Sequence, residues 1–237
     1  MTISTLAGQT LRCLLSFIEY IIPCVIFLLV VYKAFKKVPS YVFRKCLHFV
    51  AFSCVTVMIA LGESWQAAVS AAVVIIIVVY PILSALENRR WFAKLFVQKS
   101  PGEVKRSLVM LFGMFAVLTA VSWGIFGKPI ACEAAILMWG TGDAAAALVG
   151  IPYGKHKVKL KITDGKKSLE GTGAMCAVSA VCGFVILCFF GKYPAGVSVA
   201  AAVIGGFLGA VTELVSPSEY DTVTVPVVII AALLIIL

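Results

Sequence analysis

Residues 66–86, QAAVSAAVVIIIVVYPILSAL, form a mainly apolar run of 21 residues without a charged side chain. A helix of about 20 such residues crosses the hydrocarbon core of a bilayer. The rest of the chain has the same character, because 62% of its 237 residues are hydrophobic and only 13% are charged. Soluble domains carry about 25% charged residues. The composition therefore predicts an integral membrane protein.

Seven further apolar runs lie on either side of this one. We expect about eight transmembrane helices, near residues 13–32, 46–61, 66–86, 107–126, 129–150, 172–190, 195–215 and 223–237. Gly150 followed by Pro152 predicts that the fifth helix ends at residue 150. The sequence shows no fixed-period repeat and no low-complexity segment, so the prediction is a single all-α polytopic membrane domain over residues 1–237.

The basic residues are strongly segregated among the predicted loops. Eight spans place loops 33–45, 87–106, 151–171 and 216–222 on one side, and these loops hold seventeen of the 20 Lys and Arg residues. Cytosolic loops of membrane proteins carry such an excess. We therefore expect these loops in the cytosol and both termini on the opposite side. The net charge of +9 follows from this rule, so it does not indicate a nucleic-acid partner.

One acidic residue lies inside a predicted span. Asp143 stands in LMWGTGDAAAALVG, residues 137–150, a few residues from the predicted cytosolic end of the fifth helix. Ionisable residues within a membrane are costly and usually functional. Gly142 precedes it and permits a close approach of the backbone. Asp143 is therefore the first candidate for a site.

A second polar group marks the start of the second span. The stretch SYVFRKCLHF, residues 40–49, contains Arg44, Lys45 and His48. Arg44 and His48 are four residues apart and share one face of a helix. A histidine one turn inside a membrane needs a partner, which makes this face a candidate part of the same site.

The loop YGKHKVKLKITDGKKSLEG, residues 153–171, carries six lysines. Residues 157–162 alternate between lysine and apolar side chains, as in a strand with two different faces. Asp164-Gly165 is a hairpin turn signal. We therefore expect a small cytosolic β-hairpin near residues 157–167.

The end of this loop predicts a phosphate and metal site. Ser168 is a good N-cap for the sixth span, and Glu170 falls in its first turn. Lysines beside a helix N-terminus favour an anion such as phosphate, which a carboxylate would repel unless a divalent cation bridges the two. The predicted cation is Mg²⁺ or another divalent metal, held by Asp143 and Glu170. Glu213 and Asp221, near the last cytosolic loop, are further possible members.

Four motifs in this chain resemble a known family when they are taken in order. They are RKCLHF (44–49), GTGDAAAALVGIPYGKHK (140–157), GKKSLEGTGA (165–174) and TELVSPSEYDTVTVP (212–226). This order is similar to that of the CTP-dependent polyprenol and lipid kinases, which include dolichol kinase, phytol kinase and the CTP-dependent diacylglycerol kinases. The resemblance covers roughly residues 40–226. The family usually has Asp-Asn where this chain has Asp221-Thr222, so one amide is lost here.

The resemblance implies transfer of the terminal phosphate of CTP, as co-substrate, to a lipid hydroxyl at the cytosolic face of the bilayer. The acceptor would be a membrane lipid alcohol: a polyprenol, a phytol-like alcohol or diacylglycerol. The sequence does not predict an oligomeric state. Asp143 would bind the metal or accept the hydroxyl proton, and His48 or Arg44 would contact the transferring phosphate. Lys45, in the same motif, is a further candidate site residue. The residues expected to hold the nucleotide and its phosphates are Gly142, Gly154, Lys155, Lys166, Lys167, Ser168 and Gly171.

Two other functions stay open at this point. The family also contains phosphatidate cytidylyltransferases, which make CDP-diacylglycerol with related motifs. A transporter with Asp143 as its coupling-ion site is the second alternative. Transporters usually show internal repeats and ionisable residues near the midplane, whereas the polar residues here gather toward one side.

Overall fold

The structure is a computed structural model that describes residues 2–34, 38–87, 89, 92, 102–158, 165–217 and 220–237. Seven of the helices found among these residues are long and apolar enough to cross a membrane. They are α1 (Ile3–Ala34), α2 (Ser40–Ala60), α3 (Trp65–Leu86), α5 (Glu103–Thr119) with the π-helical η1 (Ala120–Ile125), α6 (Pro129–Tyr153), α7 (Leu169–Val185) with the π-helical η2 (Ile186–Phe190), and α8 (Ala195–Val215). The last helix, α9 (Asp221–Ile236), is apolar but shorter, with 16 residues.

The predicted all-α membrane architecture is therefore confirmed, with seven helices of spanning length and one shorter one in the described part of the chain. Helices are favoured because no water is available in a bilayer to satisfy backbone polar groups, and a helix pairs them internally. The prediction that the fifth helix ends at Gly150 is wrong. The helix α6 continues through Pro152 to Tyr153, and its last turn is closed by Gly154 N, which donates to Gly150 O over 3.2 Å. Pro152 removes a single donor, the N–H that would face Leu148 O, and this does not end the helix.

The predicted β-hairpin is not supported. Among the described residues the only pairing of this kind is one isolated antiparallel bridge between Lys157 and Ser168, with a bond of 3.0 Å from Val158 N to Lys167 O. Residues 159–164, which include most of the alternating stretch and Asp164, lie outside the described residues.

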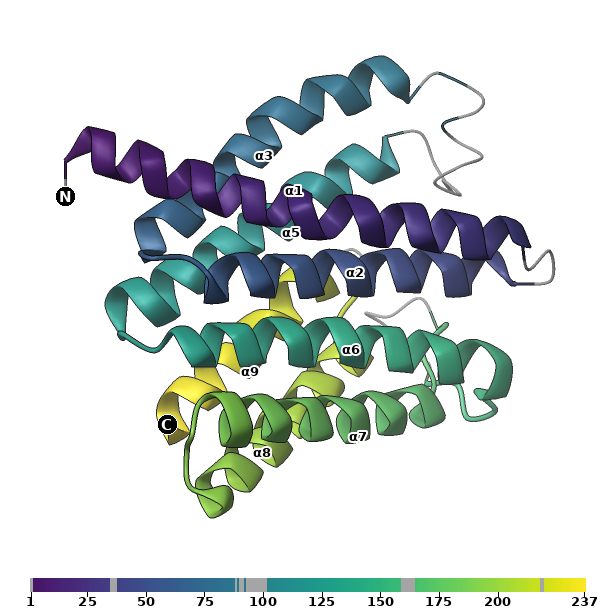
Figure 1. Cartoon of the computed structure of the whole chain (residues 1–237). Coiled ribbons are helices and arrows are strands. Elements are labelled where there is room, and N and C mark those ends of the chain that lie inside the picture. Colours follow the sequence, from purple (N-terminus) through teal and green to yellow (C-terminus); the bar gives the residue numbers. More distant parts are fainter. Residues whose placement is uncertain are drawn as a thin grey trace.

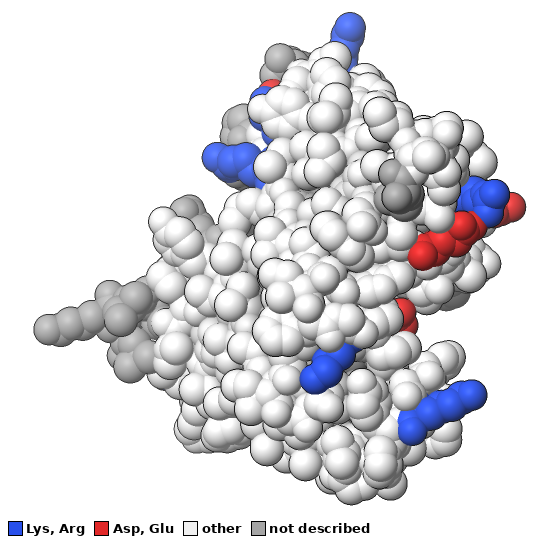
Figure 2. Space-filling model, turned by 90° about the vertical axis from the view of Figure 1, so that its left-hand side faces the viewer, with Lys and Arg blue, Asp and Glu red and all other residues white. Residues whose placement is uncertain are grey.

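The helices run back and forth, so both chain ends lie at the same end of the bundle (Figure 1). Figure 1 shows both termini on the left, with α1 and α2 side by side and α6 packed between α2 and α7. Figure 2 looks onto that end, which is mostly uncharged and carries a few separate charged side chains. We call the opposite end, where α2 and α7 begin and α6 ends, the basic end, because the lysine-rich loops attach to it.

The helix α6 lies at the centre of the packing. It contacts α2, α7 and α9, and its residues Ala131, Ala134, Ala135, Ile136 and Met138 are completely buried. An aromatic cluster lies beside them, in which the rings of Phe52 and Trp139 meet edge to face at 4.5 Å between centroids. This packed centre fixes the position of Asp143, which lies one turn beyond Trp139 on α6.

Candidate functional site

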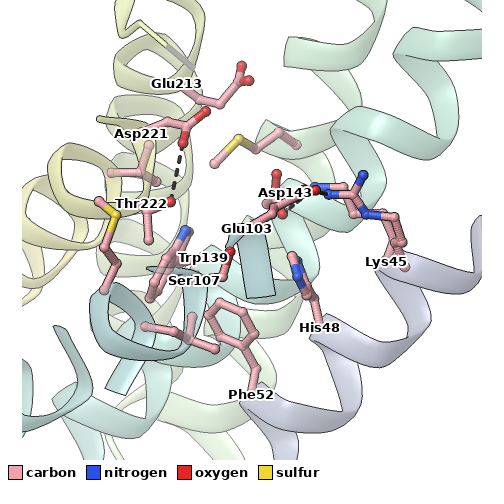
Figure 3. A pocket seen from close by; sticks show the side chains of 15 residues that line it. Lys45, His48, Phe52, Glu103, Ser107, Trp139, Asp143, Glu213, Asp221 and Thr222 are labelled. Carbon is pink, nitrogen blue, oxygen red and sulfur yellow. Dashed lines mark hydrogen bonds and ion pairs between the residues drawn. The ribbon is translucent and has the colours of Figure 1, made fainter. Parts of the chain in front are cut away.

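A polar cavity of about 350 Å³ lies among α2, α5, α6 and the C-terminal helices, toward the basic end. In Figure 3, Lys45, His48 and Phe52 come from α2 on one side, and Glu213 and Asp221 come from α8 and α9 on the other. Asp143 of α6 lies between the two groups. The side chains that line the cavity with charged, imidazole or hydroxyl groups are Arg44, Lys45, His48, Glu103, Ser107, Asp143, Glu213, Asp221 and Thr222.

The predicted α2 residues all reach this cavity. Lys45 donates to Asp143 over 2.6 Å, and Arg44 pairs with Glu103 over 2.5 Å. His48 lines the same wall, one turn farther along α2. The structure thus joins two motifs that are about a hundred residues apart in the sequence. It also shows that the Lys45 ammonium supplies the positive charge that an ionised Asp143 requires at this depth.

Lys167 holds a second set of acidic groups together. Its ammonium lies 3.1 Å from the Glu213 carboxylate and 3.4 Å from that of Asp221. It also donates to the backbone carbonyls of Glu213 and Ser216, over 2.5 and 3.1 Å. The Lys167 and Glu213 side chains are only 12% and 13% exposed, so this contact excludes most water. Lys167 therefore ties the start of α7 to the junction of α8 and α9.

A smaller cavity of about 110 Å³, which we call the loop cavity, adjoins the polar cavity. The two cavities share Asp143 and Glu213. The loop cavity is bordered by the N-terminus of α7 and by residues predicted to bind phosphate, which are Lys166, Lys167, Ser168 and Gly171. Ser168 caps α7 as predicted, since its side chain accepts a hydrogen bond from Gly171 N over 3.2 Å.

Three residues predicted to bind the nucleotide lie outside both cavities. Gly142 packs against α7, because a Cβ atom at this position would come within 2.2 Å of the Ser179 hydroxyl. Gly154 packs in the same way, with a Cβ position 2.5 Å from the Ser168 hydroxyl. Lys155 is exposed at the surface. Close packing accounts for the two glycines in this structure.

Glu170 is not brought to Asp143 as the sequence predicts. Its carboxylate accepts hydrogen bonds from His156, over 3.1 Å from the backbone nitrogen and 2.7 Å to the ring Nδ1. It lines neither cavity. The sequence places Glu170 close to the lysines along the chain, but in the structure its side chain turns toward His156, in the segment that follows α6. The acidic side chains that accompany Asp143 are Glu213 and Asp221 instead.

The donor atoms of this cavity fit a divalent cation bound together with phosphates. Within the described residues, no three His, Cys, Asp or Glu side chains form a metal site by themselves. Mg²⁺ usually takes only one or two protein carboxylates and completes its shell with phosphates and water. Asp143, Glu213 and Asp221 supply carboxylate oxygens to one cavity and are close enough to interact electrostatically. Lys45 and Lys167 balance these carboxylates in the protein alone.

Sequence reasoning missed Glu103, Ser107 and Thr222, all of which line the polar cavity. Glu103 follows Pro101-Gly102 in the first turn of α5, a position that is ordinary for an acidic residue at a helix start. The one available signal is that Glu103 and Ser107 are four residues apart and therefore share a helical face, as Arg44 and His48 do.

The chain is similar to one curated protein, the phytol kinase of Synechocystis sp. The two are 29% identical over 198 residues, which cover 79% of this chain and 76% of the relative. No family model matches the chain, and no solved structure shows significant similarity to it.

Proposed function

We propose that this chain, whose similarity to a phytol kinase supports its membership of the CTP-dependent polyprenol and phytol kinase family, phosphorylates a membrane lipid alcohol with CTP. The observation that carries the proposal is the junction of the two cavities at Asp143 and Glu213. A lysine-containing loop, which the sequence predicts to bind phosphate, and a carboxylate cluster meet there at the basic end of a membrane bundle. The excess of Lys and Arg in the loops of this end supports a cytosolic position.

Phosphoryl transfer depends mainly on positioning and on neutralising charge. Lys166 and Lys167 line the loop cavity beside the N-terminus of α7, where the positive end of the helix dipole favours an anion. The phosphates of CTP would lie in this cavity. One or two carboxylates of the set Asp143, Glu213 and Asp221 would hold Mg²⁺ together with the phosphates, whose negative charge the ion neutralises when it is bound. This assignment replaces Glu170 as a metal ligand, because the Glu170 carboxylate is hydrogen-bonded to His156.

The acceptor hydroxyl would approach from the polar cavity. Its oxygen forms a bond to the terminal phosphorus while the bond from that phosphorus to the bridging oxygen breaks, and CDP leaves. The hydroxyl proton passes to a carboxylate, for which Asp143 is the proposed acceptor because it lines both cavities. Arg44 and His48 lie on the wall of the polar cavity and would face the transferring phosphate.

The test is the variant Asp143→Asn in purified protein, with labelled CTP and phytol as substrates. We expect its kcat to fall at least a hundredfold, because the neutral amide can neither take up a proton nor neutralise a cation. The matched control is Glu133→Gln, a second acidic residue of α6 that is buried at the other end and lines neither cavity. It should stay near the wild-type rate. Near wild-type activity of Asp143→Asn would refute the assignment.

A further inference from the structure

Two mainly apolar grooves border the polar cavity. The narrow apolar groove, of about 220 Å³, lies among α1, α2, α3 and α5. The wide apolar groove, of about 610 Å³, lies among α1, α2, α6 and α7. They differ in how they join the site. The narrow groove shares Arg44, His48, Glu103, Ser107 and Leu111 with the polar cavity, whereas the wide groove shares only Lys45.

The shared end of the narrow groove is polar and has hydrogen-bonding groups to offer. Within the described part of the chain, neither the His48 ring nor the Ser107 hydroxyl makes a hydrogen bond, although both line the two spaces. An imidazole and a hydroxyl can each donate to or accept from an alcohol. Arg44 and Glu103 lie at the same border, and their opposite charges neutralise each other. This end therefore suits a neutral hydroxyl group.

The remainder of the narrow groove is apolar and runs along the helices. Its deeper lining includes Ile21, Ala51 and Phe112. Ala51 is seven residues beyond Arg44 on α2, and Phe112 is nine residues beyond Glu103 on α5. At about 1.5 Å per residue, the groove extends roughly 10–13 Å from its polar end into the apolar part of the bundle. This shape matches one hydrocarbon chain that ends in a hydroxyl.

The wide groove lacks such a polar end. Its border with the polar cavity is Lys45, whose ammonium is bound to Asp143 over 2.6 Å. A hydroxyl that arrived there would meet this ion pair before it reached the Asp143 carboxylate. The wide groove is otherwise lined by apolar residues and by Thr141. It therefore offers a surface for lipid but no hydrogen-bonding groups that would guide a hydroxyl into the polar cavity.

We propose that the narrow apolar groove binds the hydrocarbon chain of the acceptor, with its hydroxyl between His48 and Ser107 and facing Asp143. The inference rests on the proposed function and narrows it, because a groove of about 220 Å³ has room for one hydrocarbon chain rather than the two of diacylglycerol. The chain would enter between α1, α3 and α5, on the side of the bundle away from α7.

The kinetic test fills each groove with a bulky side chain. Ala51→Trp and Leu108→Trp place an indole in the narrow groove, and Val178→Trp, at a side chain that is 40% exposed, does so in the wide groove. We expect the first two variants to raise the KM for phytol at least tenfold with little change in the KM for CTP. Val178→Trp should leave both values unchanged. An increase for Val178→Trp alone, or for none of the three, would overturn the proposal.

A labelling experiment separates this inference from the proposed function. The wild-type protein in nanodiscs is exposed to a photoreactive isoprenoid alcohol, and the labelled residues are identified by mass spectrometry. We expect labelling of Leu108 that excess phytol suppresses, and little labelling of Val178. Competed labelling of Val178, or labelling that phytol does not suppress, would contradict the groove assignment. If no alcohol is phosphorylated, the proposed function fails, while the label still decides the occupancy of the groove.

Discussion

At the scale of single residues, the ion pair between Lys45 and Asp143 dominates the site. Both side chains are partly buried in a membrane bundle, at 22% and 32% exposure, so each charge needs the other. Removal of one partner leaves an uncompensated charge, which is more costly than loss of the pair as a whole. Lys45 therefore positions Asp143 and keeps it ionised for the proposed reaction.

We predict that Lys45→Met lowers kcat for lipid phosphorylation at least tenfold, and that Lys45→Arg restores part of the loss because it keeps the charge. The matched control is Lys105→Met, which breaks the Lys105–Glu87 pair of similar burial outside the polar cavity. Steady-state kinetics with CTP and phytol measure the effect. Equal losses in Lys45→Met and Lys105→Met would show that a general loss of stability is responsible.

A second residue-scale prediction concerns the two glutamates that compete for the metal role. Glu213 lines both cavities, whereas Glu170 binds His156 and lines neither. We expect Glu213→Gln to raise the Mg²⁺ concentration needed for half-maximal activity several-fold, since one carboxylate of the cluster is lost. Glu170→Gln should leave this requirement unchanged. A Mg²⁺ titration of activity compares them, and a shift confined to Glu170→Gln would restore the assignment made from the sequence.

At the scale of helices, the close contact between α6 and α7 positions the site. Gly142 faces Ser179, whose hydroxyl donates to Met138 O over 2.8 Å. Gly171 lies near α6 as well, with a Cβ position 2.9 Å from Ala146 O. These contacts bring the N-terminus of α7 next to Asp143, so the packing at these glycines sets the position of the loop cavity.

We predict that Gly142→Ala destabilises the protein by about 1–3 kcal/mol, the usual cost of overpacking, because its Cβ would overlap the Ser179 hydroxyl. The control is Gly173→Ala on α7, where a Cβ atom meets nothing within 4 Å. This change should be neutral or stabilising by up to about 1 kcal/mol, since alanine favours a helix. Thermal unfolding in detergent measures both. An unchanged midpoint for Gly142→Ala would contradict the close contact.

The helices themselves follow from local sequence, which explains why they are predictable. An apolar run of this length in a membrane is stable as a helix, because a helix pairs its own backbone groups. Ser168 is recognisable as a helix cap from the residues that follow it. The end of α6 is not predictable in this way. Gly150 O accepts from Gly154 N and also from the Lys157 ammonium, each over 3.2 Å. The second contact comes from the following loop, so the neighbouring residues of Gly150 alone do not predict it.

At the scale of the whole molecule, the separation of charge along the bundle defines an orientation. Seventeen of the 20 Lys and Arg residues belong to loops of the basic end, and both termini lie at the other end. If the positive-inside rule holds, the basic end faces the cytosol. The same end contains the polar cavity, and CTP is a cytosolic nucleotide, so topology and proposed chemistry agree.

We predict that tags at both termini are accessible from the non-cytosolic side of intact cells or vesicles. A cysteine introduced at Lys155, which is exposed, should instead react only from the cytosolic side. A membrane-impermeant thiol reagent measures this in a background without native cysteines. Reaction of the Lys155→Cys variant from the same side as the terminal tags would contradict the topology.

The composition of the site is predictable from the sequence only in part. Asp143, Arg44 and His48 stand out because polar residues are rare within apolar spans. Glu213 and Asp221 are only secondary candidates in the sequence, and Glu103 does not stand out at all, because it is an ordinary first-turn acid. Only the packing of α5, α8 and α9 around α6 brings them to the cavity. The sequence predicts Glu170 as a metal ligand because it is close to the lysines along the chain. In the structure it binds His156, since nearness along the chain does not fix the direction of a side chain.

The most direct test of the central claim uses CTP that carries one label on the terminal phosphate and a different label on the phosphate next to the ribose. The purified wild-type protein is incubated with this CTP, Mg²⁺ and phytol, and the lipid and nucleotide products are separated. We predict that only the terminal label enters the lipid and that CDP, with the other label, is formed in equal amount. Appearance of the ribose-proximal label in the lipid together with pyrophosphate, or no transfer to any alcohol, would contradict the account.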